Sequence, residues 1–363
     1  MKRFLILLGL LLAVPSFACT SVIISGKVSG TGAPVMFKHR DSSAHLDNRM
    51  EWFHGERYFF IGLVNAESAG GEVWGGTNQA GFSIMNTATY DLKDDDVPAS
   101  EMDQEGKLMY RALEICATVE DFERFLDTLS RPMHVEANFG VIDASGGAAY
   151  YEVNNFKWVK FDVNSDPAGY RVVTNFTQTG RKEDRKGEDR YLEAREIMAR
   201  MILPDGSLAF RQKGTSWHKE LMNGISRSGK PILRDVTSST IIFEGVRPGS
   251  DPEHTVMWAS VGYPTSTAYV PMMVMDSDHL PSIVKKNAAS DHCITCDIGL
   301  QLKEKDVMKE VLKTERYIDV RFDQLFGKWQ EGKLSDGDFR ASYDRLMDKY
   351  SKIYQKNFNK YVR

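Results

Sequence analysis

The chain has 363 residues, with 46 Lys and Arg against 50 Asp and Glu, a formal net charge of −4 and 42% hydrophobic residues. This composition is typical of a globular protein, and it excludes a disordered chain, a collagen-like chain and a multi-span membrane protein. A mildly acidic chain also has no general attraction for nucleic acid, so we expect no nucleic-acid partner.

The first 18 residues have the pattern of a signal peptide. A short basic start precedes an apolar run, Phe4–Val14, which is too short to span a bilayer as a permanent helix. A small-x-small cleavage site follows and ends at Ala18. We therefore expect an exported protein, periplasmic or secreted, that begins at Cys19 and forms one domain over residues 19–363.

A cysteine at the start of a chain has more than one use. Its thiol can act as a nucleophile while its free α-amino group, with a pKa of about 7.7 to 8.0, acts as a general base. Alternatively, Cys19 carries a lipid and anchors a surface binding lipoprotein to the membrane. Against lipidation, Ser16 stands where that processing prefers Leu. A third interpretation is a cysteine without function, left by the position of the cleavage site.

The segment after Cys19 predicts a β-hairpin. Thr20–Ser25 is rich in β-branched residues and predicts a strand, Gly30–Pro34 predicts a turn, and Val35–Phe37 predicts a returning strand. This hairpin would bring Lys38–Asp41 back beside Cys19. A cation near a thiol favours the thiolate, and a carboxylate can hold the α-amine in position.

Helices are predicted between strand-rich segments. Apolar residues at helical spacing predict a helix over Glu105–Leu129 and a second near Tyr191–Met201. From His254 to Met275 the pattern predicts strand, turn and strand. Beyond about Lys303 the chain is predicted to be helical and highly charged, and these helices would serve packing or dimerisation in a homo-oligomer.

The remaining cysteines and histidines predict structural roles. Cys116 lies in an apolar helical stripe, so we expect it to be buried and inert. Cys293 and Cys296 form a C-x-x-C pair, for which a local disulfide is the leading interpretation in an exported protein. His39 and His134 have no second histidine at ligand spacing, so no metal site is expected.

Several short segments follow one another in a recognisable order. They are Cys19–Ser21, Phe37–Asp41, Gly76–Asn86, Ala137–Gly146 with Tyr150–Val153, and Arg171–Phe176. In this order they resemble the motifs of the cysteine N-terminal nucleophile hydrolases. That superfamily includes choloylglycine hydrolases, penicillin V acylases and isopenicillin N acyltransferase-like enzymes.

The resemblance implies a fold and an activity. The implied fold is α+β, a four-layer αββα sandwich with two antiparallel sheets, here with added C-terminal helices. The implied activity is hydrolysis of a linear non-peptide C–N bond in a small N-acyl amide, through an acyl-enzyme and without a metal or organic cofactor. Two alternatives on the same fold remain open. One is an acyltransferase, and the other is a dipeptidase that shares the Cys-Thr start.

The resemblance also implies roles for individual residues. Cys19 would be both nucleophile and base, and Asp41 would hold its amine. Asn175 would donate a hydrogen bond to the oxyanion, and Asn86 would be a second donor.

This chain departs from the bile-salt-type members at two places. Those members carry Arg three residues before the Asp, whereas Lys38 stands here, and an ammonium is a point charge that cannot replace the guanidinium fork. Thr237–Ile241 also offers no Arg where those members have one. The acyltransferase-like branch therefore fits better than bile-salt specificity. The motif favours Lys38 as the cation beside Cys19, with Arg40 as a surface ion-pair partner.

Overall fold

The computed structural model describes residues 17–183, 185–211, 215–288 and 291–362. The predicted signal peptide therefore lies outside the described residues, except for its last two, which belong to the first strand. Within the described ranges, no helix is both long and apolar enough to span a bilayer.

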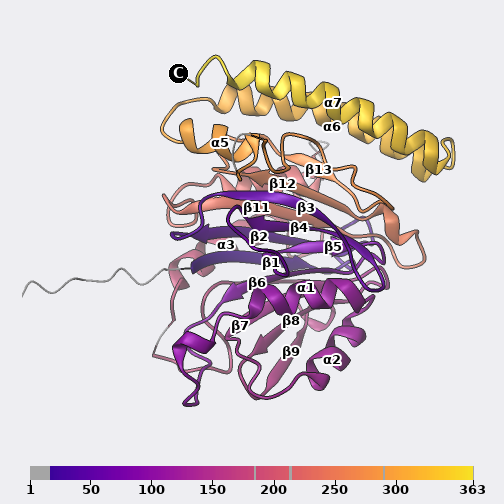
Figure 1. The fold of residues 1–363 in the computed structure, drawn as a ribbon. Coiled ribbons are helices and arrows are strands. Elements are labelled where there is room, and N and C mark those ends of the chain that lie inside the picture. Colours follow the sequence, from indigo (N-terminus) through magenta and orange to yellow (C-terminus); the bar gives the residue numbers. More distant parts are fainter. Residues whose placement is uncertain (1–16, 184, 212–214, 289–290, 363) are drawn as a thin grey trace, which may run out of the picture.

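Two antiparallel sheets form the middle of the molecule (Figure 1). The first sheet has the strand order β10-β1-β2-β11-β12-β13. In that order the bounds are Tyr170–Val173, Phe17–Ile24, Val35–Ser42, Thr237–Glu244, Val256–Val261 and Val270–Met272. The second sheet runs from β3 to β9 in chain order. Its strands are Asn48–His54, Phe59–Asn65, Gly76–Asn78, Ser83–Ala88, Ala137–Ile142, Ala148–Val153 and Trp158–Asp162.

The two sheets pack face to face. Strand β1 contacts β6 and β8 of the second sheet, and β2 contacts β7. The approach is close at Gly140 of β7, where a Cβ atom would lie 3.2 Å from Ile23 Cδ1 and 3.1 Å from Tyr150 Cε1. A side chain there would meet Met85 of the neighbouring strand first and then Ile23 of the facing sheet, so these side chains would have to repack.

Helices cover both outer faces of the pair of sheets. Helices α1 (Glu105–Ile115) and α2 (Val119–Thr128) pack on the second sheet. On the first sheet lie α3 (Glu188–Met201), α4 (Trp217–Leu221), α5 (Ile294–Gln301), α6 (Met308–Gln330) and α7 (Asp336–Phe358). Short helical turns span Ala99–Glu101, Val163–Ser165, Met222–Ser226 and Pro252–His254. The predicted α+β sandwich with added C-terminal helices is thus confirmed, and Figure 1 shows α6 and α7 as an outermost hairpin.

The helix predicted over Glu105–Leu129 is in fact two helices. Thr118 Oγ1 accepts a hydrogen bond from Asp121 N, and Asp121 Oδ2 accepts from Thr118 N, so the two residues form a capping box that starts α2. Hydrophobic periodicity alone did not reveal this interruption, because the apolar residues of both helices face the same sheet. Cys116 is buried as expected, and burial raises the pKa of its thiol to about 12.

The predicted disulfide between Cys293 and Cys296 is wrong, because both are free, buried thiols. Cys293 Sγ donates to Asn48 O at 3.2 Å, and Asn48 N donates to Cys296 Sγ at 3.4 Å. Burial raises the pKa of Cys293 to about 11, so the thiol stays protonated and can donate. Both sulfurs therefore bind the backbone at the start of β3.

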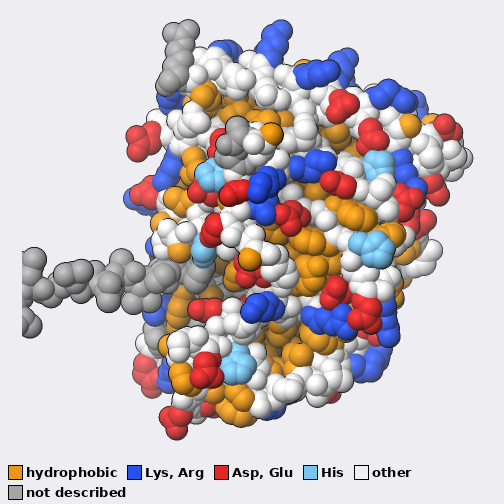
Figure 2. All heavy atoms as spheres, viewed as in Figure 1, with side chains coloured by type: hydrophobic (Ala, Val, Ile, Leu, Met, Phe, Trp, Pro, Cys, Tyr) orange, Lys and Arg blue, Asp and Glu red, His pale blue; other side chains and the backbone are white. Residues whose placement is uncertain are grey.

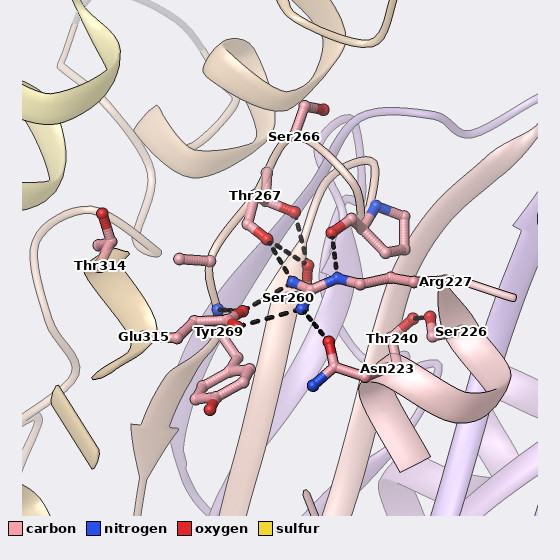
Figure 3. A network of polar contacts seen from close by, with 12 residues as sticks. Asn223, Ser226, Arg227, Thr240, Ser260, Ser266, Thr267, Tyr269, Thr314 and Glu315 are labelled. Atoms are coloured by element: carbon pink, nitrogen blue, oxygen red, sulfur yellow. Dashed lines mark hydrogen bonds and ion pairs between the residues drawn. The ribbon is translucent and has the colours of Figure 1, made fainter. Parts of the chain in front are cut away.

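A buried ion pair joins α6 to the segments beneath it (Figure 3). Arg227 Nη2 lies 2.7 Å from Glu315 Oε1, and the same guanidinium donates to Pro264 O at 2.7 Å and Thr267 O at 3.1 Å. Asn223 Oδ1 accepts a further bond at 2.9 Å. Since a buried charge is costly without partners, this network ties the position of α6 to that of the first sheet.

A buried imidazole makes a second connection to α6. His218 of α4 lies 3.1 Å from Glu244 Oε1 and 3.4 Å from Asp319 Oδ1, and its ring stacks on Trp258 with centroids 3.6 Å apart. Burial lowers the pKa of His218, but the two carboxylates outweigh burial and raise it to about 9. The imidazole is therefore charged at neutral pH and links α4, β11 and α6.

We expect the His218→Gln variant to lose stability in a pH-dependent way. A histidine whose pKa rises from 6.5 to about 9 on folding adds about 3 kcal/mol to the free energy of unfolding below pH 6.5, and loses this contribution as the pH rises through 9. The difference between wild type and variant should therefore be about 3 kcal/mol larger at pH 6 than at pH 9.5, measured by urea unfolding. An equal difference at both pH values would show that His218 is uncharged.

The surface is of mixed character. Figure 2 shows acidic and basic side chains interspersed over the visible face, with hydrophobic side chains gathered near its middle. This face therefore carries no large patch of a single charge sign.

Candidate active site

The β1–β2 hairpin sets the geometry of the site. In its register Cys19 lies opposite Arg40, and Ala18 lies opposite Asp41. Because side chains alternate along a strand, Cys19, Lys38 and Arg40 share the face toward the second sheet, whereas Asp41 shares the other face with Ala18. The predicted return of this segment beside Cys19 is confirmed. The prediction that Arg40 is a surface residue is wrong, since it is only 2% exposed.

A cavity of about 460 Å³ lies beside Cys19. Its walls come from the ends of strands β4 and β6, the loop after β4 and the start of α1. The residues that line it are Cys19, His45, Asn65, Glu67, Ser68, Ala69, Gly70, Glu72, Trp74, Asn86, Ala88, Asp103, Glu105 and Lys107. Cys19 and the amide side chains of Asn65 and Asn86 therefore line one cavity that is open to solvent.

Lys38 is buried beneath this cavity and fixes the orientation of Asn86. Its Nζ donates to Asn86 Oδ1 at 2.9 Å and to Trp74 O. Burial lowers the pKa of Lys38 to about 7, a negative charge on Cys19 opposes this shift, and Arg40 adds to it. At neutral pH Lys38 is therefore partly charged, and a thiolate at Cys19 favours the charged form. In that form it has donors only, so the amide oxygen of Asn86 faces Lys38 and Nδ2 points away from it.

Arg40 is also a buried cation, and its partners are amides. One guanidinium nitrogen donates to Asn48 Oδ1, and Nη2 donates to Asn65 Oδ1 at 2.8 Å. In the part of the chain that the structure describes, neither Arg40 nor Lys38 forms an ion pair with a carboxylate. Burying unpaired charge is unfavourable, so a thiolate at Cys19 would be a natural counter-ion on the same face.

Asn175 and Arg190 hold the backbone of Cys19. Asn175 Oδ1 accepts from Cys19 N at 2.9 Å and from Arg190 Nη2 at 2.7 Å, while Asn175 Nδ2 donates to Ala88 O at 2.7 Å. Arg190 Nη1 donates to Cys19 O. The predicted role of Asn175 as an oxyanion donor does not fit these contacts, because its oxygen faces the backbone nitrogen of Cys19 and its own nitrogen donates to Ala88 O.

Arg190 was not predicted from the sequence. It lies 171 residues from Cys19 in a helix with many charges, and no short motif distinguishes it from its neighbours. Burial of this one arginine, at 4% exposure, is the signal that separates it from the exposed arginines of α3, and burial requires the fold.

Asp41 lies beside the peptide bond that precedes Cys19. Its Oδ1 accepts from Thr237 Oγ1 at 2.7 Å. Its Oδ2 has no hydrogen-bond partner among the described residues and lies 3.6 Å from an Arg234 nitrogen. Burial raises the pKa of Asp41 to about 7, against the hydrogen bond from Thr237. One buried carboxylate oxygen is therefore available next to Ala18, the residue opposite Asp41.

The structure shows no metal-binding group within its described ranges, where no three His, Cys, Asp or Glu side chains are arranged to hold an ion. His39 instead binds hydroxyl groups, with Ser226 Oγ 2.8 Å from Nδ1 and Thr237 Oγ1 3.1 Å from Nε2. Burial lowers the pKa of His39 to about 3, so its ring is neutral and serves as a hydrogen-bonding core residue.

No protein-family model matches the chain, and no curated protein matches it in sequence. Among solved structures, the N-acylethanolamine-hydrolyzing acid amidase ortholog of Caenorhabditis elegans has 16% identity and a TM-score of 0.44, covering 64% of this chain and 93% of that one. Penicillin V acylase from Agrobacterium tumefaciens has 14% identity and a TM-score of 0.43, and the match covers 70% of this chain and 86% of that one. A variant of conjugated bile acid hydrolase from Clostridium perfringens has 11% identity and a TM-score of 0.45, and the match covers 72% of this chain and 93% of that one.

These similar structures include kinds of protein that the sequence resemblance names, such as penicillin V acylases. Their TM-scores all lie below 0.5 and their identities below 25%. The function of this chain therefore has to be argued from its own contacts.

We expect Arg190→Lys to weaken the structure around Cys19. A single ammonium cannot reach both Cys19 O and Asn175 Oδ1 as the guanidinium fork does, so the free energy of unfolding should fall by about 1 to 3 kcal/mol in urea unfolding. Arg195→Lys is the matched control, since Arg195 is exposed on the same helix and lies over the ring of Tyr191. Equal stability of the two variants would contradict the positioning role of Arg190.

Proposed function

We propose that this chain is an exported N-terminal cysteine amidohydrolase, periplasmic or secreted, that cleaves a linear non-peptide amide through an acyl-enzyme on Cys19. The observation that carries the proposal is the surroundings of Cys19. Two buried cations without carboxylate partners, Lys38 and Arg40, share its face, and the free amide nitrogen of Asn86 lines the same cavity.

Removal of residues 1–18 would complete the catalytic group. The nitrogen of Cys19 would become an α-amine with a pKa of about 7.7 to 8.0, able to accept a proton near neutral pH. Asn175 Oδ1, 2.9 Å from this nitrogen, would orient it. Asp41 Oδ2, which makes no hydrogen bond among the described residues and lies near Arg234, would face the space left by Ala18 and bind the charged amine.

The reaction then has two steps. In the first, the α-amine takes the thiol proton, the Cys19 sulfur attacks the amide carbon, and the carbonyl electron pair moves to oxygen, where Asn86 Nδ2 donates a hydrogen bond. The C–N bond breaks, and the leaving amine takes the proton held by the α-amine. In the second step, water deprotonated by the α-amine attacks the thioester, releasing the acid and restoring the thiol.

We expect Cys19→Ser to lose almost all turnover. In the wild type, the exported protein should have the mass of a chain that starts at Cys19. Incubation of this wild-type protein with an N-acyl p-nitroanilide should add the mass of one acyl group to Cys19. Serine at this position should lower kcat by about 100-fold or more, since an alcohol is a weaker nucleophile than a thiolate. Cys116→Ala, which removes a remote buried thiol, is the control for loss of a cysteine.

Other outcomes of the same experiment identify the alternatives. A lipid mass on Cys19 would contradict the enzyme and support an anchored binding lipoprotein. Transfer of the acyl group to an added amine would identify an acyltransferase, and release of amino acids from dipeptides would identify a dipeptidase.

The entrance of the cavity bears on the charge of the substrate. Three partly or fully exposed carboxylates line it, from Glu67, Glu72 and Asp103, and Glu105 lies deeper. Burial raises the pKa of Glu105 to about 7, so this group is partly protonated at neutral pH. Lys107 is the one lysine in the lining. The rim is therefore net negative and should repel anionic substrates.

We expect kcat/KM to depend on substrate charge. Among anilides that carry the same acyl group, it should be highest for a cationic substrate, lower for a neutral one and lowest for an anionic one. Each exposed rim carboxylate should contribute about a twofold to fivefold discrimination, which 0.5 M salt should reduce. Glu72→Gln should lower the ratio of kcat/KM for the cationic substrate to kcat/KM for the anionic substrate, without changing kcat for the neutral substrate. A preference for anionic substrates would contradict this assignment.

A further inference from the structure

We propose that Asn65 supplies a second amide donor to the carbonyl oxygen that reacts at Cys19, an inference that rests on the proposed amide hydrolysis. Asn65 is the last residue of β4, is 3% exposed, and lines the cavity together with Cys19 and Asn86. It does not belong to any of the segments on which the sequence resemblance depends.

The orientation of the Asn65 amide follows from its partner. Its Oδ1 accepts from Arg40 Nη2 at 2.8 Å. A guanidinium has donors only, so the oxygen must face Arg40 and Nδ2 must point elsewhere. Within the described residues Nδ2 of Asn65 makes no hydrogen bond, although the residue is almost fully buried. The amide nitrogen is therefore the part of this side chain that remains available to a molecule in the cavity.

Asn48 shows that this freedom is specific to Asn65. Its Oδ1 also accepts from Arg40, but its Nδ2 donates to Leu46 O at 2.9 Å and to His45 O at 3.4 Å. Asn48 does not line the cavity. Of the two asparagines bound to Arg40, only Asn65 therefore has both a free donor and access to the cavity beside Cys19.

Asn65 and Asn86 are held in the same way. Lys38 and Arg40 lie two residues apart on one face of β2, and each binds the amide oxygen of an asparagine that lines the cavity. Both NH2 groups are thereby left to the cavity. Donors that are oriented before the substrate arrives stabilise developing charge without reorganisation, which is the requirement for an oxyanion site.

This arrangement explains why the two buried cations contact amides. A carboxylate at position 65 would pair with Arg40 and relieve the cost of its burial, but it would place a negative oxygen where the substrate carbonyl becomes negative. When the Cys19 sulfur attacks, the carbonyl electron pair moves to oxygen and no proton crosses to Asn65. The second donor would thus be Asn65, and Asn175 would remain the acceptor that holds Cys19 N.

Asn65→Asp tests this role directly. Aspartate has the same shape and keeps an acceptor for Arg40, but it replaces the free donor with an oxygen. We expect kcat and the rate of acyl-enzyme formation to fall about 10²- to 10³-fold, while KM stays within about threefold and the melting temperature is unchanged or higher. The affinity for a substrate-like aldehyde, which forms a tetrahedral adduct with the thiol, should fall in parallel with kcat.

Asn48→Asp is the matched control for added charge. Asn48 Oδ1 also accepts from Arg40, so an aspartate there puts a negative charge beside the same guanidinium, but outside the cavity. This variant should keep at least about tenfold more kcat than Asn65→Asp, because it pairs Arg40 without placing an oxygen in the cavity.

The outcomes separate this inference from the proposed function. If the wild type forms no acyl-enzyme on Cys19 with any amide, the proposed function fails. If the wild type turns over and folded Asn65→Asp keeps its rate of acylation, the inference about Asn65 is wrong. An equal loss in folded Asn48→Asp would also overturn it, because the pairing of Arg40 with a carboxylate would then account for the effect.

Discussion

The pairing of β1 with β2 is the constraint on which the site depends. Its register places Cys19 opposite Arg40 and Ala18 opposite Asp41. A shift by one residue would exchange the faces of the sheet, so the cations would leave the thiol. On one face the sulfur meets the cavity, and on the other the backbone before Cys19 meets a buried carboxylate. One hairpin thus separates the proposed space for the substrate from the place where the proposed α-amine of Cys19 would form.

The electrostatics of the site follow from what surrounds the two cations of that hairpin. Lys38 and Arg40 are buried against amide and carbonyl oxygens, which satisfy their hydrogens without cancelling their charge. Two buried charges elsewhere do have counter-ions, Arg227 with Glu315 and His218 with Glu244 and Asp319. Lys38 and Arg40 instead leave positive charge without a carboxylate partner on the face of Cys19, where the proposed thiolate and oxyanion would form.

Much of the architecture could be predicted because its causes are local. A run rich in β-branched residues predicted β1, and helical spacing predicted α3 and the C-terminal helices. The break between α1 and α2 was missed because the Thr118 capping box interrupts the helix without changing the apolar pattern. The disulfide was predicted from C-x-x-C spacing alone, whereas the backbone of Asn48 binds both thiols in the folded chain.

The sequence by itself predicted which residues lie near Cys19 in the first hairpin, because Lys38 and Asp41 belong to the strand that pairs with its own. Only the tertiary structure decided the rest. Arg190 reaches Cys19 O from a helix 171 residues away, and the orientation of the Asn65 and Asn86 amides depends on cations from the other sheet. A side-chain amide has a donor and an acceptor of equal size, so its chemical role is set by the partner that the fold places against it.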